Sequence, residues 1–269
     1  NVIFIAEADD FEKVNEVIQN IFSQQNSLKD DAQFNGKNYS IYYKPGDYTE
    51  TDSVPVGFYT HVGGLGKVPT DVKLNNMEVP AYLDERGNAN AGNYWDDGGN
   101  NGAWRNATCN FWRSAENLSI VGTGKSSVTA HDGIEGKVAP YSNNWSADKF
   151  SWSVAQAAPL RRVYSTRDVT YDWSYGWASG GYTADCLFEG DAKTDSGQQY
   201  FTRNSVVKGN AIGTTLNNFN MGVVSDSLPT TNELINGNGY SNWGVAGENN
   251  AQQVTTNILQ TPTVKEKPF

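Results

Sequence analysis

Short apolar runs that return at intervals constrain the fold of this chain more than any other feature. From Phe150 to Asn220 and just beyond, the runs LRRVYS, CLFEG, SVVKG and MGVVSD recur roughly every 16 to 27 residues, separated by Gly, Asn and Asp. This spacing is typical of a coil in which each run is one strand and successive coils stack. A single coil cannot bury its inward face, so only the stack is stable.

Composition favours the same architecture and a neutral ligand. The 269 residues include 27 Gly, 14 Tyr and 8 Trp, which favours an all-β fold over a helix bundle. The formal net charge of −10 argues against nucleic acid or an anionic membrane as partner, and it weakens the case for a pectin-like polyanionic substrate. No apolar run is long enough to span a bilayer.

The N-terminal segment predicts a helix that closes one end of the coil. A β-prone run, NVIFIA, comes first, and Asp9 or Asp10 can then cap a helix. The strand YSIYYKPGDY follows and ends in a Pro-Gly turn. Many right-handed parallel β-helices begin in this way, although an α+β unit of another kind is the alternative. The apolar face of the helix comprises Phe11, Val14, Val17, Ile18, Ile21 and Phe22.

The sequence predicts three long loops and one linker. Residues 85–106 and 126–149 are poor in aliphatic side chains, and a third such segment follows Asp226. Long loops of this kind are often functional. Residues 256–269 predict an extended linker toward a missing second β-helix, which leaves residues 1–255 as a single domain.

No metal site and no cofactor is expected. The pair Asp96-Asp97 matches no calcium loop, and two histidines, His61 and His131, are too few for a typical histidine zinc site or serine triad.

The cysteines and the glycosylation sequons leave the compartment open. Cys109 and Cys186 either form one disulfide, worth about 4 kcal/mol across so long a loop, or are two buried free thiols. The chain begins at Asn1 without a charged and apolar leader, which fits the removal of a leader from a secreted protein. Sequons that permit secretion occur at Asn38, Asn106, Asn117 and Asn144.

Three motifs carry a resemblance to a known family. The segments SWSVAQAAPLRRV, WASGGYTADCLFEG and SGQQYFTRNSVV resemble, in the same order, the N-terminal half of family 55 glycoside hydrolases, the β-1,3-glucanases built from two tandem β-helices. The resemblance implies an all-β, right-handed parallel β-helix of the pectin-lyase-like type, with an N-terminal capping helix and long loops. It also implies an inverting, exo-acting enzyme whose cleft lies between the two β-helices.

The resemblance further implies which residues hold the attacking water. In an inverting mechanism a carboxylic acid protonates the leaving oxygen while water attacks the opposite face of the sugar. The acid of the family lies in the second β-helix, so this chain would supply Gln156, Ser179 and Gln199, with Gln198 as the alternative amide. An amide oxygen orients water but is too weak a base to deprotonate it alone.

Candidate substrate-binding residues lie beside these motifs. Aromatic rings next to amides suit sugars, whose C–H faces pack on rings. Each candidate also has a structural alternative: a Gln ladder, a tight turn, a coil corner or a ring that covers a coil end. The sequence departs from the family where Trp177 enters the Ser-Gly-Gly turn and where TTLNNFN replaces a Trp-rich coil. The candidates are Gln198, Trp145, Trp173, Trp177, Tyr200 and Asp185.

Two functions from different classes remain open. The chain is either the N-terminal half of a secreted glycoside hydrolase that needs a C-terminal β-helix half, as a separate or cleaved chain, or a non-catalytic β-helix that binds a neutral glucan or serves as a structural module. A polysaccharide lyase is not expected, because no cluster of acids accompanies a basic residue.

Overall fold

Parallel strands dominate the computed structural model, which describes residues 1–25, 31–79, 82–84, 104–106, 110–122, 150–171, 178–194, 197–211, 217–236 and 254–262. A large sheet holds the following strands in spatial order: β1 (Val2–Ile5), β2 (Tyr39–Tyr43), β5 (Thr60–Gly64), β10 (Arg113–Ile120), β12 (Pro159–Ser165), β14 (Tyr182–Ala184), β17 (Phe201–Arg203), β19 (Asn218–Met221), β21 (Val254–Ile258) and β20 (Glu233–Asn236).

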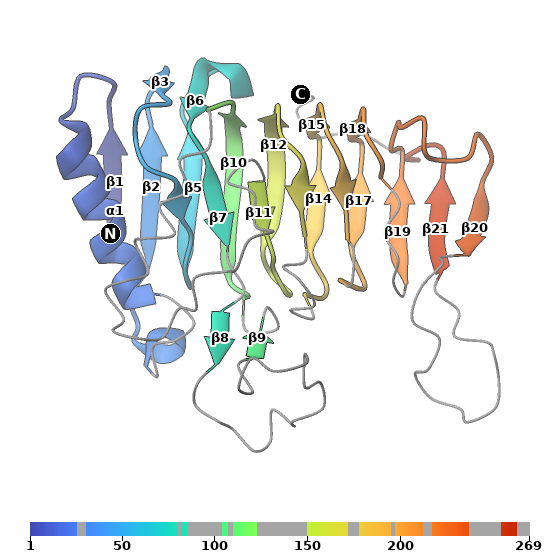
Figure 1. Ribbon diagram of the computed structural model, residues 1–269, viewed down its shortest axis with the longest axis horizontal. Helices are drawn as coiled ribbons and strands as arrows, with labels where there is room; N and C mark the ends of the chain where they lie inside the picture. The colour runs from blue at the N-terminus through green and yellow to red at the C-terminus, as the bar shows by residue number, and fades with distance from the viewer. Residues whose placement is uncertain are drawn as a thin grey trace.

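Neighbouring strands of the large sheet follow one another along the chain and run parallel, from β1 as far as β21. Only the pairing of β20 with β21 is antiparallel within the described part of this sheet. Figure 1 shows these strands side by side, from the blue N-terminal end to the red C-terminal end. Shorter strands extend the same sheet: β3 (Gly46–Tyr48), β6 (Val72–Leu74), β15 (Leu187–Phe188) and β18 (Val206–Val207).

A second parallel sheet takes one short strand from several returns of the chain. Its members alternate in sequence with those of the large sheet, so the chain passes repeatedly between the two sheets. Its order is β16 (Ala192–Lys193), β13 (Val169–Thr170), β11 (Phe150–Trp152), β7 (Met77–Val79) and β4 (Val54–Pro55). The prediction of a mostly-β protein with recurring parallel strands is confirmed.

The predicted N-terminal helix is present as α1 (Phe11–Gln25). Asp10 is its N-terminal cap, because its carboxylate accepts the backbone N–H of Glu12 at 3.1 Å. The buried side chains of α1 join the hydrophobic core at the end of the large sheet where β1 lies (Figure 1). Val17 was predicted on the apolar face but is 43% exposed, so the buried stripe is narrower than expected.

Two short 3-10 helices and a hairpin complete the described elements. The 3-10 helices are η1 (Ala32–Phe34) and η2 (Pro69–Asp71), and the antiparallel hairpin pairs β8 (Tyr82–Asp84) with β9 (Trp104–Asn106). Within the described residues, no helix has the length and apolar character needed to cross a membrane.

One left-handed residue precedes the strand on each successive return to the large sheet from β5 to β19. The strand registers align these residues in a column, which we call the first corner. Because an L-residue enters this region at a cost, the repeated turn is a feature that the surrounding structure maintains. The first corner comprises Tyr59 (φ 49°), Trp112 (φ 57°), Ala157 (φ 56°), Gly180 (φ 82°), Gln199 (φ 60°) and Asn217 (φ 56°).

A second column of left-handed residues, the second corner, follows the first along the strands. It bends the chain and interrupts the alternation of side chains, so that Leu160 and Val163, three residues apart, both face the core. Its members are Asn117 (φ 59°), Arg162 (φ 51°), Asp185 (φ 55°), Asn204 (φ 46°) and Gly222 (φ 65°). Asn, Asp and Gly tolerate this conformation best, which explains their recurrence in the sequence.

The C-terminal predictions are partly wrong. Residues 256–258 belong to β21, which pairs with β19, so the predicted linker does not begin at residue 256. Glu233 to Asn236 form β20, although a loop was predicted there. The predicted loop at 126–149 and residues 263–269 lie outside the described residues.

Candidate functional site

The predicted water-binding residues lie on the turns that precede three neighbouring strands, β12, β14 and β17. Pro159, Tyr182 and Phe201 are register partners at the starts of these strands. Gln156, Ser179 and Gln198 each lie three residues earlier, and Gln199 occupies the first corner next to Gln198. The repeated turn therefore places equivalent positions side by side on consecutive returns of the chain.

Two contacts bring Gln156, Ser179 and Gln199 together. The Ser179 hydroxyl donates a hydrogen bond to Oε1 of Gln199 at 3.1 Å. The Gln156 side chain lies over Gly180, since a Cβ atom built on Gly180 would lie 2.9 Å from Cγ of Gln156. Gln156 and Gln199 are exposed and Ser179 is half-buried. The three side chains, called the amide-hydroxyl trio below, thus form one solvent-facing polar group.

The Ser-Gly-Gly motif has a separate requirement at each glycine. Gly180 adopts φ 82° in the first corner and leaves room for the Gln156 side chain. A Cβ atom on Gly181 would overlap the ring of Tyr200, with Cδ1 at only 2.6 Å. The second glycine therefore makes space for an aromatic ring from the next return of the chain.

Tyr200 does not offer its ring to a ligand, which contradicts its prediction as a sugar contact. Its side chain is 2% exposed, and its hydroxyl lies 2.7 Å from the carbonyl oxygen of Val154 and 2.8 Å from that of Tyr171. The ring packs against Tyr171 with centroids 5.1 Å apart. Tyr200 is a core residue that holds three returns of the chain together behind the trio.

Asp185 is likewise a structural residue and not a substrate contact. It occupies the second corner and is 3% exposed. Its carboxylate accepts hydrogen bonds from Nε of Arg161 at 3.3 Å and from the side-chain amide of Asn204 at 3.4 Å. A buried carboxylate paired in this way has its charge satisfied inside the protein.

Four predicted substrate contacts remain: Gln198, which the structure describes, and three tryptophans, which it does not. Gln198 is half-buried, and its backbone forms a parallel bridge with Ser179. Trp145, Trp173 and Trp177 lie outside the described residues. Across the part of the chain that the structure describes, no group of three or more His, Cys, Asp or Glu side chains is placed to hold a metal ion.

The trio is suited to orienting a water molecule or a sugar hydroxyl. Amides and a hydroxyl offer both donors and acceptors without a charge. Because the Ser179 hydroxyl donates its hydrogen bond to Gln199, its oxygen keeps the capacity to accept one, and the exposed amides of Gln156 and Gln199 add further donors and acceptors. None of the three is a carboxylic acid, so the trio alone supplies no general acid.

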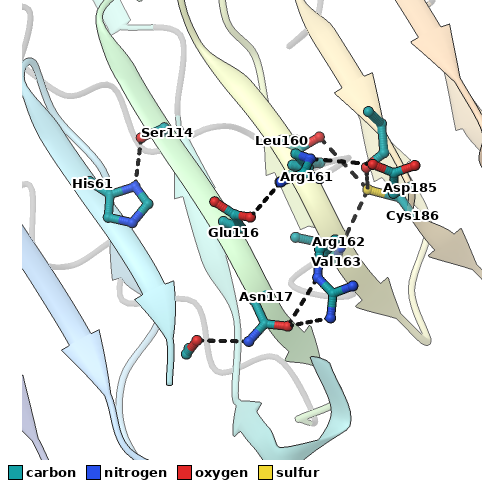
Figure 2. Close-up of polar contacts among 12 residues, drawn as sticks. His61, Ser114, Glu116, Asn117, Leu160, Arg161, Arg162, Val163, Asp185 and Cys186 are labelled. Atoms are coloured by element: carbon teal, nitrogen blue, oxygen red, sulfur yellow. Dashed lines mark hydrogen bonds and ion pairs between the residues drawn. The ribbon is translucent and has the colours of Figure 1, made fainter. Parts of the chain in front are cut away.

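A polar cluster lies on β5, β10 and β12 and was not predicted from the sequence. Nδ1 of His61 lies 2.7 Å from the Ser114 hydroxyl, and Nη1 of Arg161 donates to Oε1 of Glu116 at 2.8 Å (Figure 2). Glu116 pairs with Arg161 and not with His61, so the His-Ser contact is not a catalytic triad. Glu116 and Arg161 are register partners on β10 and β12. This pairing has no signal in the sequence until the strands are aligned.

Cys186 resolves part of the cysteine question. It is a buried free thiol, and its sulfur lies 3.2 Å from the carbonyl oxygen of Ala184 (the thiol is drawn in Figure 2). Burial raises its pKa to about 12, so the thiol is neutral at physiological pH. Of the two alternatives, the structure supports a free thiol at Cys186, while Cys109 lies outside the described residues.

Comparison with known proteins yields one sequence relative and matching solved structures. No family model matches the chain. An exo-β-1,3-glucanase from Streptomyces sp. (strain SirexAA-E / ActE) is 33% identical over 196 residues, which cover 71% of this chain and 24% of that protein.

Solved structures of sacteLam55A from Streptomyces sp. SirexAA-E match the whole fold. One has a TM-score of 0.64 at 28% identity, and the match covers 100% of this chain and 37% of that chain. A second, of a variant in complex with glucose, has a TM-score of 0.65 at the same 28% identity and the same coverage. The chain thus spans about a quarter of the curated relative and just over a third of each solved chain.

The motifs, the parallel strands and these comparisons all indicate similarity to the same group of proteins. The resemblance inferred from the VAQA, SGGY and GQQY motifs is confirmed in both sequence and structure. The chain is thus similar in sequence to an exo-β-1,3-glucanase and similar in fold to sacteLam55A.

Proposed function

We propose that this chain is the N-terminal half of an inverting glycoside hydrolase that acts on a neutral, β-1,3-linked glucan. The observation that carries the proposal is the amide-hydroxyl trio, in which Ser179 bonds to Gln199 and Gln156 lies on the adjacent turn. The similarity to an exo-β-1,3-glucanase supports the substrate class.

The proposed scaffold is a right-handed parallel β-helix. The alternation of strands between two parallel sheets supports it, and so do the two corners repeated on successive returns. In this arrangement α1 caps one end, where it covers strand edges that would otherwise pair with another chain. The rigid stack fixes the backbone of each trio residue relative to the next, which a flexible loop would not do.

In the proposed mechanism the trio holds the attacking water. The Gln156 and Gln199 amides and the Ser179 hydroxyl would fix the position of the water against the anomeric carbon, so that little orientation entropy is lost in the transition state. Protonation of the leaving oxygen requires a carboxylic acid. We assign that acid to a C-terminal half, since the relatives are several times longer than this chain.

The proposed biological setting is extracellular. A secreted enzyme would meet an insoluble neutral glucan such as a cell-wall polysaccharide. The net charge of −10 suits a neutral substrate and disfavours a polyanion. The C-terminal β-helix half would be a covalent continuation or a separate or cleaved partner.

Reducing-sugar release from laminarin tests the proposal. We expect no release from the chain alone and release when it is combined with its C-terminal half. In the combined enzyme, Gln156→Ala and Ser179→Ala should each lower kcat by about 10- to 100-fold through loss of water positioning. Gln260→Ala removes an exposed glutamine beyond β21 and serves as the matched control, with unchanged kcat. Full activity in the two trio variants would contradict the mechanism.

A non-catalytic glucan-binding module is the second candidate. The absence of any carboxylic acid from the trio favours it. This candidate predicts saturable laminarin binding by the chain alone, with no sugar released in any combination with a C-terminal half.

A further inference from the structure

A cavity of about 270 Å³ opens on the outward face of the large sheet, apart from the trio. It lies over β2, β5, β10 and β12, and none of the trio residues lines it. Tyr42, His61, Gly63 and Glu116 contribute to its walls. The volume is slightly below the usual range for small-molecule sites and is large enough for one sugar unit.

The lack of a side chain at Gly63 lets the groups that line the cavity approach one another. Tyr42, Gly63 and Glu116 are register partners on three adjacent strands. Strands lie about 4.8 Å apart, so Tyr42 and Glu116 are separated by roughly 10 Å with no side chain between them. A Cβ atom on Gly63 would lie 2.9 Å from Nε2 of His61 and 3.0 Å from the Tyr42 ring, so both groups lean over the glycine.

Polar atoms with capacity for a ligand face this space. Nδ1 of His61 is occupied by Ser114 at 2.7 Å, while Nε2, on the side of Gly63, has no partner among the described residues. Oε1 of Glu116 accepts from Arg161, and Oε2 has no partner among the described residues. Figure 2 shows His61 and Glu116 projecting from neighbouring strands on the same face.

Arg161, one of the two cations that line the cavity, is already paired with carboxylates. Arg161 bonds to two carboxylates, Glu116 at 2.8 Å and Asp185 at 3.3 Å. Arg162 donates through Nη2 to Oδ1 of Asn117 at 3.0 Å. An anion entering the cavity would meet the carboxylate of Glu116 and an Arg161 guanidinium that is already paired with two carboxylates. A neutral ligand with hydroxyl groups avoids this repulsion.

Aromatic and polar groups are arranged as a pyranose requires. The Tyr42 ring stacks on Phe4, with centroids 5.9 Å apart, and the His61 ring meets it edge-on over Gly63, with centroids 5.4 Å apart. An aromatic wall facing an acceptor and a donor suits a sugar, which has apolar C–H faces and hydroxyls at its rim. Burial also lowers the pKa of His61, so its ring is neutral at pH 7 and can bond to a hydroxyl.

We propose that the cavity formed by Tyr42, His61, Gly63 and Glu116 is a second carbohydrate-binding site, which accepts one neutral pyranose unit of a glucan. It binds a sugar and performs no chemistry, because Glu116 is held by Arg161. A binding site apart from the trio would hold the chain on the polysaccharide while the cleft is empty. It would thereby increase the local concentration of substrate near the cleft. The choice of a β-1,3-linked glucose probe rests on the proposed function.

The ring nitrogens of His61 report directly on the cavity. Because His61 and His131 are the two histidines of the chain, a His131→Gln variant leaves a single imidazole in a long-range ¹H–¹⁵N spectrum. Titration with laminaritriose should shift the Nε2 signal of His61 saturably and leave Nδ1, which is bonded to Ser114, much less affected. Inorganic phosphate should produce no saturable shift.

Two substitutions test the cavity by independent routes. Gly63→Val removes no polar group but adds a side chain that must displace His61 and the Tyr42 ring, and Glu116→Ala removes the acceptor. We expect each to weaken laminaritriose binding by at least about tenfold. Glu189→Ala is the matched control, since Glu189 also pairs with a cation, Lys208 at 2.6 Å, but does not line the cavity. Circular dichroism checks that each variant is folded.

The outcomes separate this proposal from the proposed function. An unchanged His61 spectrum, an equal shift in the Gly63→Val protein, or a shift with phosphate alone overturns the second site. A Gln156→Ala/Ser179→Ala double variant should retain the His61 response. If laminarin is hydrolysed while His61 does not respond, the second site fails alone. If His61 responds while no combination with a C-terminal half releases sugar, the hydrolase proposal fails and the second site stands.

Discussion

Replacing Gly181 by Ala tests how the stack positions the trio, because the change introduces one methyl group at a contact between two returns of the chain. The new Cβ would lie 2.6 Å from Cδ1 and 2.9 Å from Cζ of Tyr200. Cε1 of the same ring would be nearer still, and carbon atoms in contact are normally about 3.5–4.0 Å apart, so the ring must move by more than about 1 Å. The backbone conformation of Gly181 is ordinary, so the expected effect is steric.

The Tyr200 ring cannot move freely. Its hydroxyl is within hydrogen-bond distance of the carbonyls of Val154 and Tyr171, and its side chain is 2% exposed. Overpacking at a site of this kind costs about 1–3 kcal/mol, and loss of the hydroxyl bond adds about 1 kcal/mol. We therefore expect Gly181→Ala to lower the free energy of unfolding by about 2–4 kcal/mol. Since Tyr200 follows Gln199 directly, the Ser179–Gln199 bond should also be disturbed.

Chemical denaturation of the variants measures this cost. Gly36→Ala is the control, because Gly36 has open space around it but φ 72°, so this change tests backbone strain without a clash. It should cost about 1 kcal/mol. In a Tyr200→Leu background, where the ring is absent, Gly181→Ala should cost at least about 1 kcal/mol less than in the original protein. An equal cost in both backgrounds would refute the steric argument.

Three further predictions follow from buried polar groups. Burial raises the pKa of Cys186 to about 12. In a Cys109→Ser protein, the folded chain should therefore react with a disulfide reagent at pH 8 at least about a hundredfold more slowly than the chain in denaturant. Rapid reaction in the folded state would show that the thiol is exposed. Arg161→Met leaves the carboxylate of Asp185, which is 3% exposed, without its cation. This change should lower the free energy of unfolding by about 2 kcal/mol. An unchanged denaturation midpoint would mean that the ion pair is not formed. Burial lowers the pKa of His61 below its unfolded value of about 6.5, so its contribution to stability is present above that pH and is lost as the pH falls through the folded pKa. The unfolding free energy should decline less between pH 7 and 5 in His61→Gln, and an identical decline in both proteins would contradict this assignment.

The repeat pattern and the N-terminal helix were predictable because they depend on local periodicity. The runs CLFEG and SVVKG contain β15 and β18, and Asp10 caps α1 as expected. The proximity of Gln156 and Ser179 also followed from motif order, since equivalent positions recur on each return.

The roles of Tyr200 and Asp185 were not predictable, because they depend on contacts between returns of the chain. A tyrosine beside two amides reads as a sugar platform until Gly181 is seen to make room for it in the core. The sequence presents Asp185 as an acid near a catalytic motif, while the alignment of strands places it among left-handed residues at the second corner. The cavity at Gly63 depends on register across three strands, which no local pattern encodes.

A crystal structure of the chain with laminaritriose would show whether the amide-hydroxyl trio holds a water molecule against a sugar. We expect a glucose unit against the trio, with an ordered water that bonds to Ser179 and to the amide of Gln156 or Gln199. A bound sugar that leaves all three side chains uncovered, or a trio whose members point apart when sugar is bound, would contradict it.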